Sequence, residues 1–195
     1  MRYRSTFSAF LFLAAAASSA AAQATVRAAP STRATAEVVF TLADSASRAN
    51  SNPAKLKLDY GQPHLRGRAI HTDSLVPYDK PWRTGANDAT TLDTDLDLMI
   101  GGKPVPRGKY VIETMPSRTG WKLLLIREDA PEPAPDTPYN PASYFAVIDL
   151  RGSTLSPPAE SLTMALIPAR GDGAPRGELR ISWGTTSQSV DWVVR

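Results

Sequence analysis

Short stretches in which apolar and polar residues alternate dominate the chain. Period-two alternation is typical of strands with one buried face, and no apolar stripe with the roughly 3.6-residue period of a helix accompanies it. Several short strands separated by Gly, Pro and Asp predict an all-β fold, an antiparallel β-sandwich of a jelly-roll-like or barrel-like variant. The predicted strands cover residues 37–42, 55–60, 91–100, 109–115, 121–127, 144–150, 162–167, 178–183 and 189–194.

Residues 1–24 have the pattern of a secretory signal peptide, with a basic start, an apolar run and small residues at the end. Cleavage after Ala22 and cleavage after Ala24 fit equally well. The apolar run is too short to cross a bilayer, and no later segment is long enough. We therefore expect an exported, periplasmic or extracellular protein without a membrane span. Residues 25–50 are expected to form a flexible mature N-terminus with a first strand, and 51–195 a single β-sandwich domain.

Charge and cysteine content exclude several classes of function. The formal net charge is +3, but two of the 22 basic residues lie in the leader, so the mature chain has 20 basic against 19 acidic side chains. A nearly neutral protein has no long-range field to attract nucleic acid, which we therefore do not expect as a partner. The chain has no Cys, which excludes disulfides and thiol chemistry and leaves stability to packing.

One long irregular segment, residues 61–88, interrupts the predicted strands. It holds three Pro and three Gly but also many apolar side chains, so an ordered loop is expected. Trp121, Trp183 and Trp192 stand in alternating strands and are expected in the core, whereas Trp82 lies in this loop.

Most candidate functional residues fall in or beside this loop. Planar guanidinium groups suit the recognition of carboxylate, sulfate or phosphate, and flat aromatic rings suit the faces of sugars. Alternatively, the arginines pair with Asp73, Asp79 and Asp88 and hold the loop against the sheet. The ligand-binding candidates are His64, Arg66, Arg68, Tyr78, Trp82, Arg83, Asn87 and Asp88.

No catalytic residue can be assigned. His64, His71 and Asp73 are weak candidates for binding zinc or iron, but their spacing matches no compact ligand motif, so no cofactor is predicted. No serine occupies a glycine-x-serine-x-glycine turn. A non-catalytic module that binds a glycan or another cell-envelope component is therefore favoured. A hydrolase using the region around these three residues, with or without a metal, and a structural envelope domain remain open.

The loop also carries a family resemblance. Its motifs are Tyr60-x-x-Pro63, Gly67-Arg68, the run from Leu75 to Tyr78 and the block from Trp82 to Thr90. With Gly108-Lys109-Tyr110 and Trp121, they resemble a bacterial exported family catalogued as a domain of unknown function, number twenty-nine eleven. The similarity is best over residues 50–128. The resemblance implies a family but no activity.

Overall fold

The computed structural model describes residues 29–42, 44, 47, 52–72, 75–133 and 138–195; the predicted leader lies outside these ranges. The described residues form antiparallel strands in the order β1-β2-β3-β6-β7-β8-β9-β4-β5 and one 3₁₀ turn, η1 (Pro141–Ser143). The predicted all-β fold is confirmed. The strands are β1 (Thr32–Phe40), β2 (Ala54–Gln62), β3 (Thr90–Thr94), β4 (Leu98–Ile100), β5 (Lys103–Val105), β6 (Gly108–Pro116), β7 (Trp121–Arg127), β8 (Ala146–Ala169) and β9 (Arg176–Val194).

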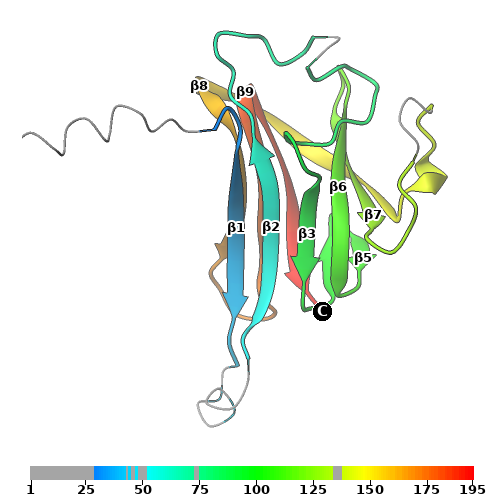
Figure 1. Ribbon diagram of the computed structural model, residues 1–195. Coiled ribbons are helices and arrows are strands. Elements are labelled where there is room, and N and C mark those ends of the chain that lie inside the picture. The colour runs from blue at the N-terminus through cyan, green and yellow to red at the C-terminus, as the bar shows by residue number, and fades with distance from the viewer. Residues whose placement is uncertain (1–28, 43, 45–46, 48–51, 73–74, 134–137) are drawn as a thin grey trace, which may run out of the picture.

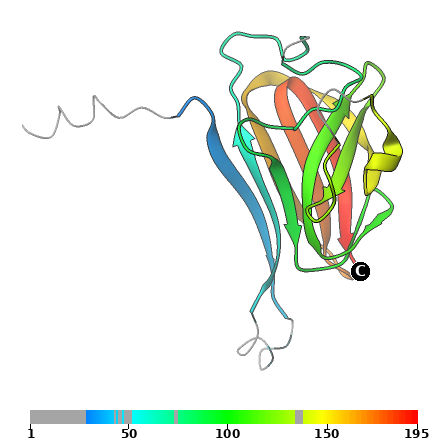
Figure 2. The same cartoon turned by 45° about the vertical axis from the view of Figure 1, so that its right-hand side comes forward.

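The long hairpin of β8 and β9 gives the sheet its two layers. Figures 1 and 2 show both strands bending at the top of the molecule and crossing behind β1, β2, β3 and β6. The first part of β8 pairs with β7. Its last part reaches β2, where the Tyr60 hydroxyl accepts a hydrogen bond of 3.0 Å from the backbone N–H of Met164. One hairpin therefore contributes to both layers around a shared core.

Apolar residues of alternating strands fill this core, as predicted. Trp121, Trp183 and Trp192 are 7%, 3% and 2% exposed, which confirms their expected place. Phe40 of β1 packs edge-on against Trp192, with ring centroids 6.0 Å apart. No helix among the described residues is long and apolar enough to cross a bilayer.

The strand predicted over 91–100 is wrong as a single element. It consists of β3, which pairs with β2 and β6, and β4, which pairs with β5 and β9. The Thr94 side chain causes the break because its hydroxyl donates to the Leu96 carbonyl over 2.7 Å and accepts from the Leu96 N–H over 3.2 Å. This local bend does not disturb the alternation of apolar residues, so the pattern could not indicate it.

Four other predicted strands merge into two. Residues 146–150 of the segment 144–150 and the whole of 162–167 belong to β8, and 178–183 and 189–194 belong to β9. The Ser156-Pro157-Pro158 segment lies where the β8–β9 register shifts, and Gly184 has a positive φ of 58°. Pro and Gly therefore accompany bends here rather than strand ends. At the other end of the chain, β1 already begins at Thr32, earlier than the predicted start at residue 37.

Candidate functional site

The excursion between β2 and β3 lies at the top of the molecule in Figure 1, and we call its described residues, 63–72 and 75–89, the loop face. Its first part is attached to β8, since the N–H of Leu65 donates to the carbonyl of Glu160 over 2.8 Å. Its later part is attached to β6, with which Trp82 exchanges two backbone hydrogen bonds of 2.7 and 2.9 Å. The loop face therefore bridges the two layers and is ordered, as expected.

Three tryptophans anchor the loop face in the core. Trp82 stacks on Trp183, with centroids 5.8 Å apart and an interplanar angle of 12°, and meets Trp121 edge-on at 6.5 Å. Trp82 is only 8% exposed. Its ring is thus turned inward and contributes packing rather than an open face for a sugar.

The aromatic contacts continue outward to an arginine. His71 meets Trp121 edge-on at 5.6 Å and stacks on Tyr78 at 4.4 Å. The guanidinium carbon of Arg118, from the exposed turn between β6 and β7, lies 4.8 Å from the centre of the Tyr78 ring. Among the described residues, no hydrogen-bond or ion-pair partner of this guanidinium is found, so Arg118 is oriented by a ring while its N–H groups are open to a ligand.

The three predicted arginines of the loop face are exposed, and each bonds to backbone carbonyls. Within the described part of the chain none of them forms an ion pair with a carboxylate, so their charges are not neutralised there. The acceptors are the carbonyl of Pro30 for Arg66 (2.8 Å), those of His64 and Leu65 for Arg68 (2.8 and 3.0 Å), and that of Asn87 for Arg83 (3.2 Å).

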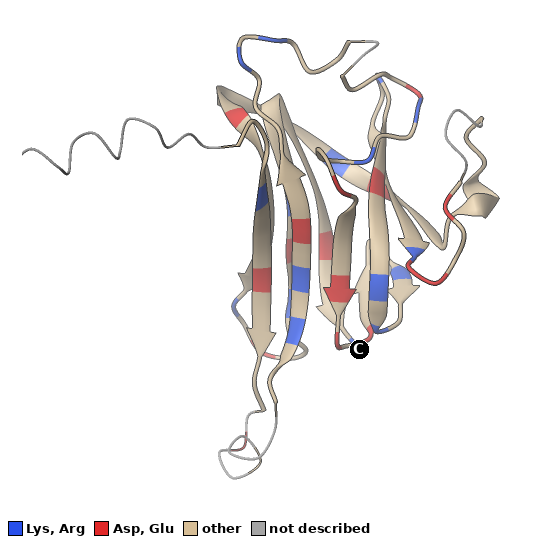
Figure 3. Cartoon of the chain, viewed as in Figure 1, with Lys and Arg blue, Asp and Glu red and all other residues tan. Residues whose placement is uncertain are grey.

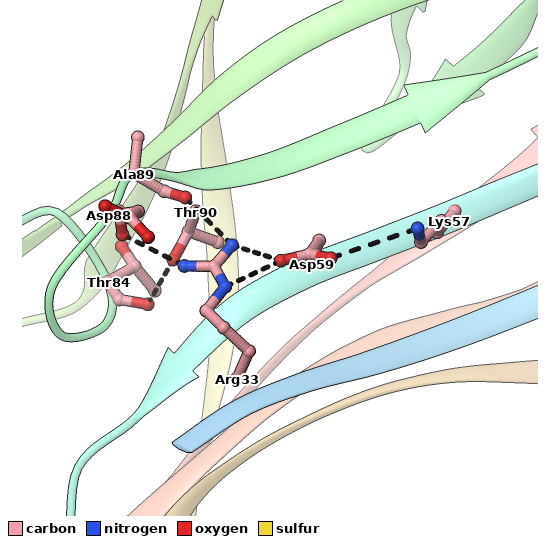
Figure 4. A network of polar contacts seen from close by, with 7 residues as sticks. All are labelled: Arg33, Lys57, Asp59, Thr84, Asp88, Ala89 and Thr90. Carbon is pink, nitrogen blue, oxygen red and sulfur yellow. Dashed lines mark hydrogen bonds and ion pairs between the residues drawn. The ribbon is translucent and has the colours of Figure 1, made fainter. Parts of the chain in front are cut away.

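A fourth arginine, Arg33 of β1, holds the end of the loop face onto the sheet. Its guanidinium forms an ion pair with Asp59 of β2, with Nε 2.7 Å from the carboxylate oxygen. It also donates to the carbonyls of Asp88 and Ala89, over 3.1 and 3.2 Å, as Figure 4 shows. Asp88 therefore binds the Arg33 guanidinium through its backbone carbonyl. The role of Arg33 has no signal in the sequence, because its partners are far away along the chain.

The turn before β3 is held by further local contacts. Asn87 has a positive φ of 63°, which asparagine tolerates better than most residues, and its side-chain N–H₂ donates to the Ser31 carbonyl over 3.1 Å. Gly61 of β2 lies against the backbone of Ala86, so closely that a Cβ on Gly61 would be 1.7 Å from the Ala86 oxygen. These contacts give the block that contains Asn87 and Asp88 a structural role in the turn.

The two histidines have different surroundings. His64 Nδ1 lies 2.6 Å from the Ser161 hydroxyl of β8, a pairing that sequence spacing could not reveal. His71 directs its Nδ1 to the Val76 carbonyl over 3.3 Å within the aromatic contacts. No group of three His, Asp or Glu suited to a metal ion occurs in the part of the chain that the structure describes. Asp73, the third weak metal candidate, falls outside that part.

A half-buried acid on the outer face of β6 was not predicted. Burial raises the pKa of Glu113, and the nearby Glu132 raises it further, while a hydrogen bond of 3.2 Å from the Tyr144 hydroxyl acts in the opposite direction. Burial and the neighbouring Glu113 raise the pKa of Tyr144. The Tyr144 phenol thus stays protonated and donates a hydrogen bond to the Glu113 carboxylate.

The structure also has an open groove of about 880 Å³ beside β9, lined in part by Ile167 and Trp192. Most of its charged groups pair with one another, and Arg176 instead donates to the carbonyl of Asp172 over 2.8 Å. Arg151 binds both carboxylate oxygens of Asp191, over 2.9 and 2.6 Å, and also lies near Glu178. A ligand there would have to compete with these pairs, unlike a ligand at Arg118.

The fold and the loop face together define a small all-β domain with a cationic, aromatic-backed surface at one end. The family model described as protein of unknown function (DUF2911) matches residues 43–192, so the chain belongs to this family. The resemblance identified from the loop motifs is thereby confirmed. Neither a curated protein nor a solved structure matches the chain.

Proposed function

We propose that this protein is a non-catalytic exported module that binds an anionic glycan or a similar acidic component of the cell envelope through its loop face and the adjoining β6–β7 turn, which carries Arg118. The observation that carries the proposal is the Arg118 guanidinium, which is stacked on Tyr78 and has no partner among the described residues. Export is supported by the signal-peptide pattern of residues 1–24.

Stacking makes Arg118 a suitable anion receptor. A guanidinium offers two parallel N–H donors to a carboxylate, sulfate or phosphate. The Tyr78 ring, itself backed by His71 at 4.4 Å, limits the freedom of the Arg118 side chain and so lowers the entropy lost on binding. Because the Arg118 guanidinium has no ion-pair partner among the described residues, no ion pair must break before the ligand binds.

The surrounding charge also favours an anion. Figure 3 shows that basic side chains predominate along the loop face. The exposed Arg66, Arg68 and Arg83 lie on the same segment, and their guanidinium groups bond to carbonyl oxygens rather than to carboxylates. They therefore add positive potential, although the Glu160 carboxylate lies at the backbone N–H of Arg66. An extended acidic polymer fits such a spread of charge better than a small neutral sugar does.

The test is binding of purified protein to three immobilised polysaccharides: polygalacturonate (carboxylated), heparin (sulfated) and dextran (neutral). We expect retention by an acidic polymer and none by dextran. Arg118→Gln should weaken retention at least tenfold, about the 1.4 kcal/mol that one lost charged hydrogen bond represents. Arg118→Lys should recover only part, since an ammonium keeps the charge but loses the fork.

Arg107→Gln is the matched control. Arg107 precedes β6 and Arg118 follows it, so the control removes the same charge from an exposed position at the far end of that strand. Equal losses in the two variants would refute a specific site at Arg118 and leave only a diffuse charge effect. Failure of both acidic polymers to bind would refute the proposed function.

A further inference from the structure

The two edges of the sheet are built differently. The β5 edge is only three residues long and contains Lys103 and Pro104, both of which discourage a further strand from pairing. The β1 edge is nine residues long, pairs with β2 in continuous register, and contains neither Lys nor Pro. The β5 edge therefore has three of the usual protections against edge-to-edge association, namely short length, Lys and Pro, and the β1 edge has none of these three.

The inner face of β1 is also incompletely buried. Ala34, Ala36 and Val38 pack against the core but remain partly exposed, whereas Leu56 and Leu58 of the neighbouring β2 are 1% and 0% exposed. This difference arises because, among the described residues, β1 has a strand on one side only, as both views of the fold show (Figures 1 and 2). Another strand alongside β1 would complete the burial of these side chains.

The outward-facing residues of β1 are complementary to themselves. Arg33, Thr35 and Glu37 are the exposed positions in the middle of the strand, with opposite charges on either side of Thr35 (Figure 3). An antiparallel copy centred on Thr35 places each Arg33 opposite the Glu37 of the other copy. Directly opposite residues in such a pair are neighbours, and opposite charges there are favourable.

This pairing would also extend charge contacts already present. Within one chain, Arg33 binds Asp59 of β2, and Glu37 lies 3.3 Å from the Lys55 ammonium. Across the two copies, charges would alternate in sign from Asp59 and Arg33 of one copy to Glu37 and Lys55 of the other. We propose that the protein forms a homodimer in which β1 pairs antiparallel with β1 of a second copy about a two-fold axis at Thr35, joining the two sheets into one.

The chain has no cysteine, so a single introduced cysteine reports this contact directly. In the proposed dimer, Thr35→Cys faces its own copy and should give a covalent dimer with a mild oxidant or a short bismaleimide. Ser153→Cys, exposed on β8 within the sheet, should not. Equal cross-linking of both variants, or of neither, would overturn the proposal.

Light scattering as a function of protein concentration provides the second measurement. The unmodified protein should approach twice the monomer mass, and Thr35→Lys should halve that mass by placing two ammonium groups at the axis. Ser153→Lys should remain dimeric, and the melting temperature of dilute Thr35→Lys should stay near that of the dilute unmodified protein. A monomeric unmodified protein, or a dimer insensitive to Thr35→Lys, would refute pairing through β1.

Discussion

Gly61 allows the loop face to lie against the sheet, so Gly61→Ala tests that contact. A Cβ at Gly61 would be 1.7 Å from the oxygen, 2.6 Å from the carbonyl carbon and 2.9 Å from the nitrogen of Ala86. All three are backbone atoms, so no side-chain rotation can relieve the overlap. The turn before β3 would have to withdraw from β2 by more than an ångström.

The energetic cost has two parts. Overpacking of this kind costs about 1–3 kcal/mol. Withdrawal of the turn would also stretch the hydrogen bonds from Arg33 to the Asp88 and Ala89 carbonyls, each of which contributes about 1 kcal/mol. We expect Gly61→Ala to lower the free energy of unfolding by about 3 kcal/mol, or the melting temperature by about 6–12 °C for a domain of this size.

Urea and thermal unfolding of Gly61→Ala, compared with Gly120→Ala, provide the measurement. A Cβ at Gly120 would have no atom within 4 Å, and the same Gly-to-Ala change in the unfolded chain applies to both variants. If the two variants differed by less than about 0.5 kcal/mol, within the scatter of surface substitutions, the close approach of the turn to β2 would be wrong.

Two other substitutions test the environments of buried groups. Because burial raises the pKa of Glu113, folding favours the protonated form of this carboxyl. The stability that its protonation contributes is present at acid pH and is lost as pH rises through the folded-state pKa. Glu113→Gln should therefore unfold at a higher temperature than the unmodified protein at pH 7 but not at pH 4, and Glu128→Gln, an exposed control, should show no such difference. Trp82→Ala should lower the free energy of unfolding by about 3–5 kcal/mol, measured with urea; a loss below about 1 kcal/mol would contradict its place between Trp183 and Trp121.

The sequence predicted the strands and the core well because alternation directly reports which face of a strand is buried. It predicted the core positions of Trp121, Trp183 and Trp192 for this reason. Alternation does not report where a strand bends or which strand it pairs with. The break at Thr94 and the continuity of β8 through Pro157 depend on hydrogen bonding and register, and both were missed.

The candidate site was predicted as a region but not as a set of contacts. The ordered loop was predicted correctly for its described residues. Arg118, Arg33 and Ser161 were not proposed, because each meets its partner through strand pairing or packing between distant segments. A single arginine in a short turn looks like any solvated charge until the Tyr78 ring beneath it is known.

The folded-over hairpin has a consequence for how the chain acquires its structure. Residues at the end of β9 join distant segments: the N–H of Val194 donates to the carbonyl of Pro175 over 2.8 Å, and the N–H of Arg195 donates to the carbonyl of Asp97 over 2.9 Å. β1, β2, β3, β6 and β7 pair with one another, whereas the second layer and one of the two pairings of β4 need β8 and β9. Closure of the core therefore depends on pairing between segments far apart in the chain, and non-local β contacts of this kind form slowly.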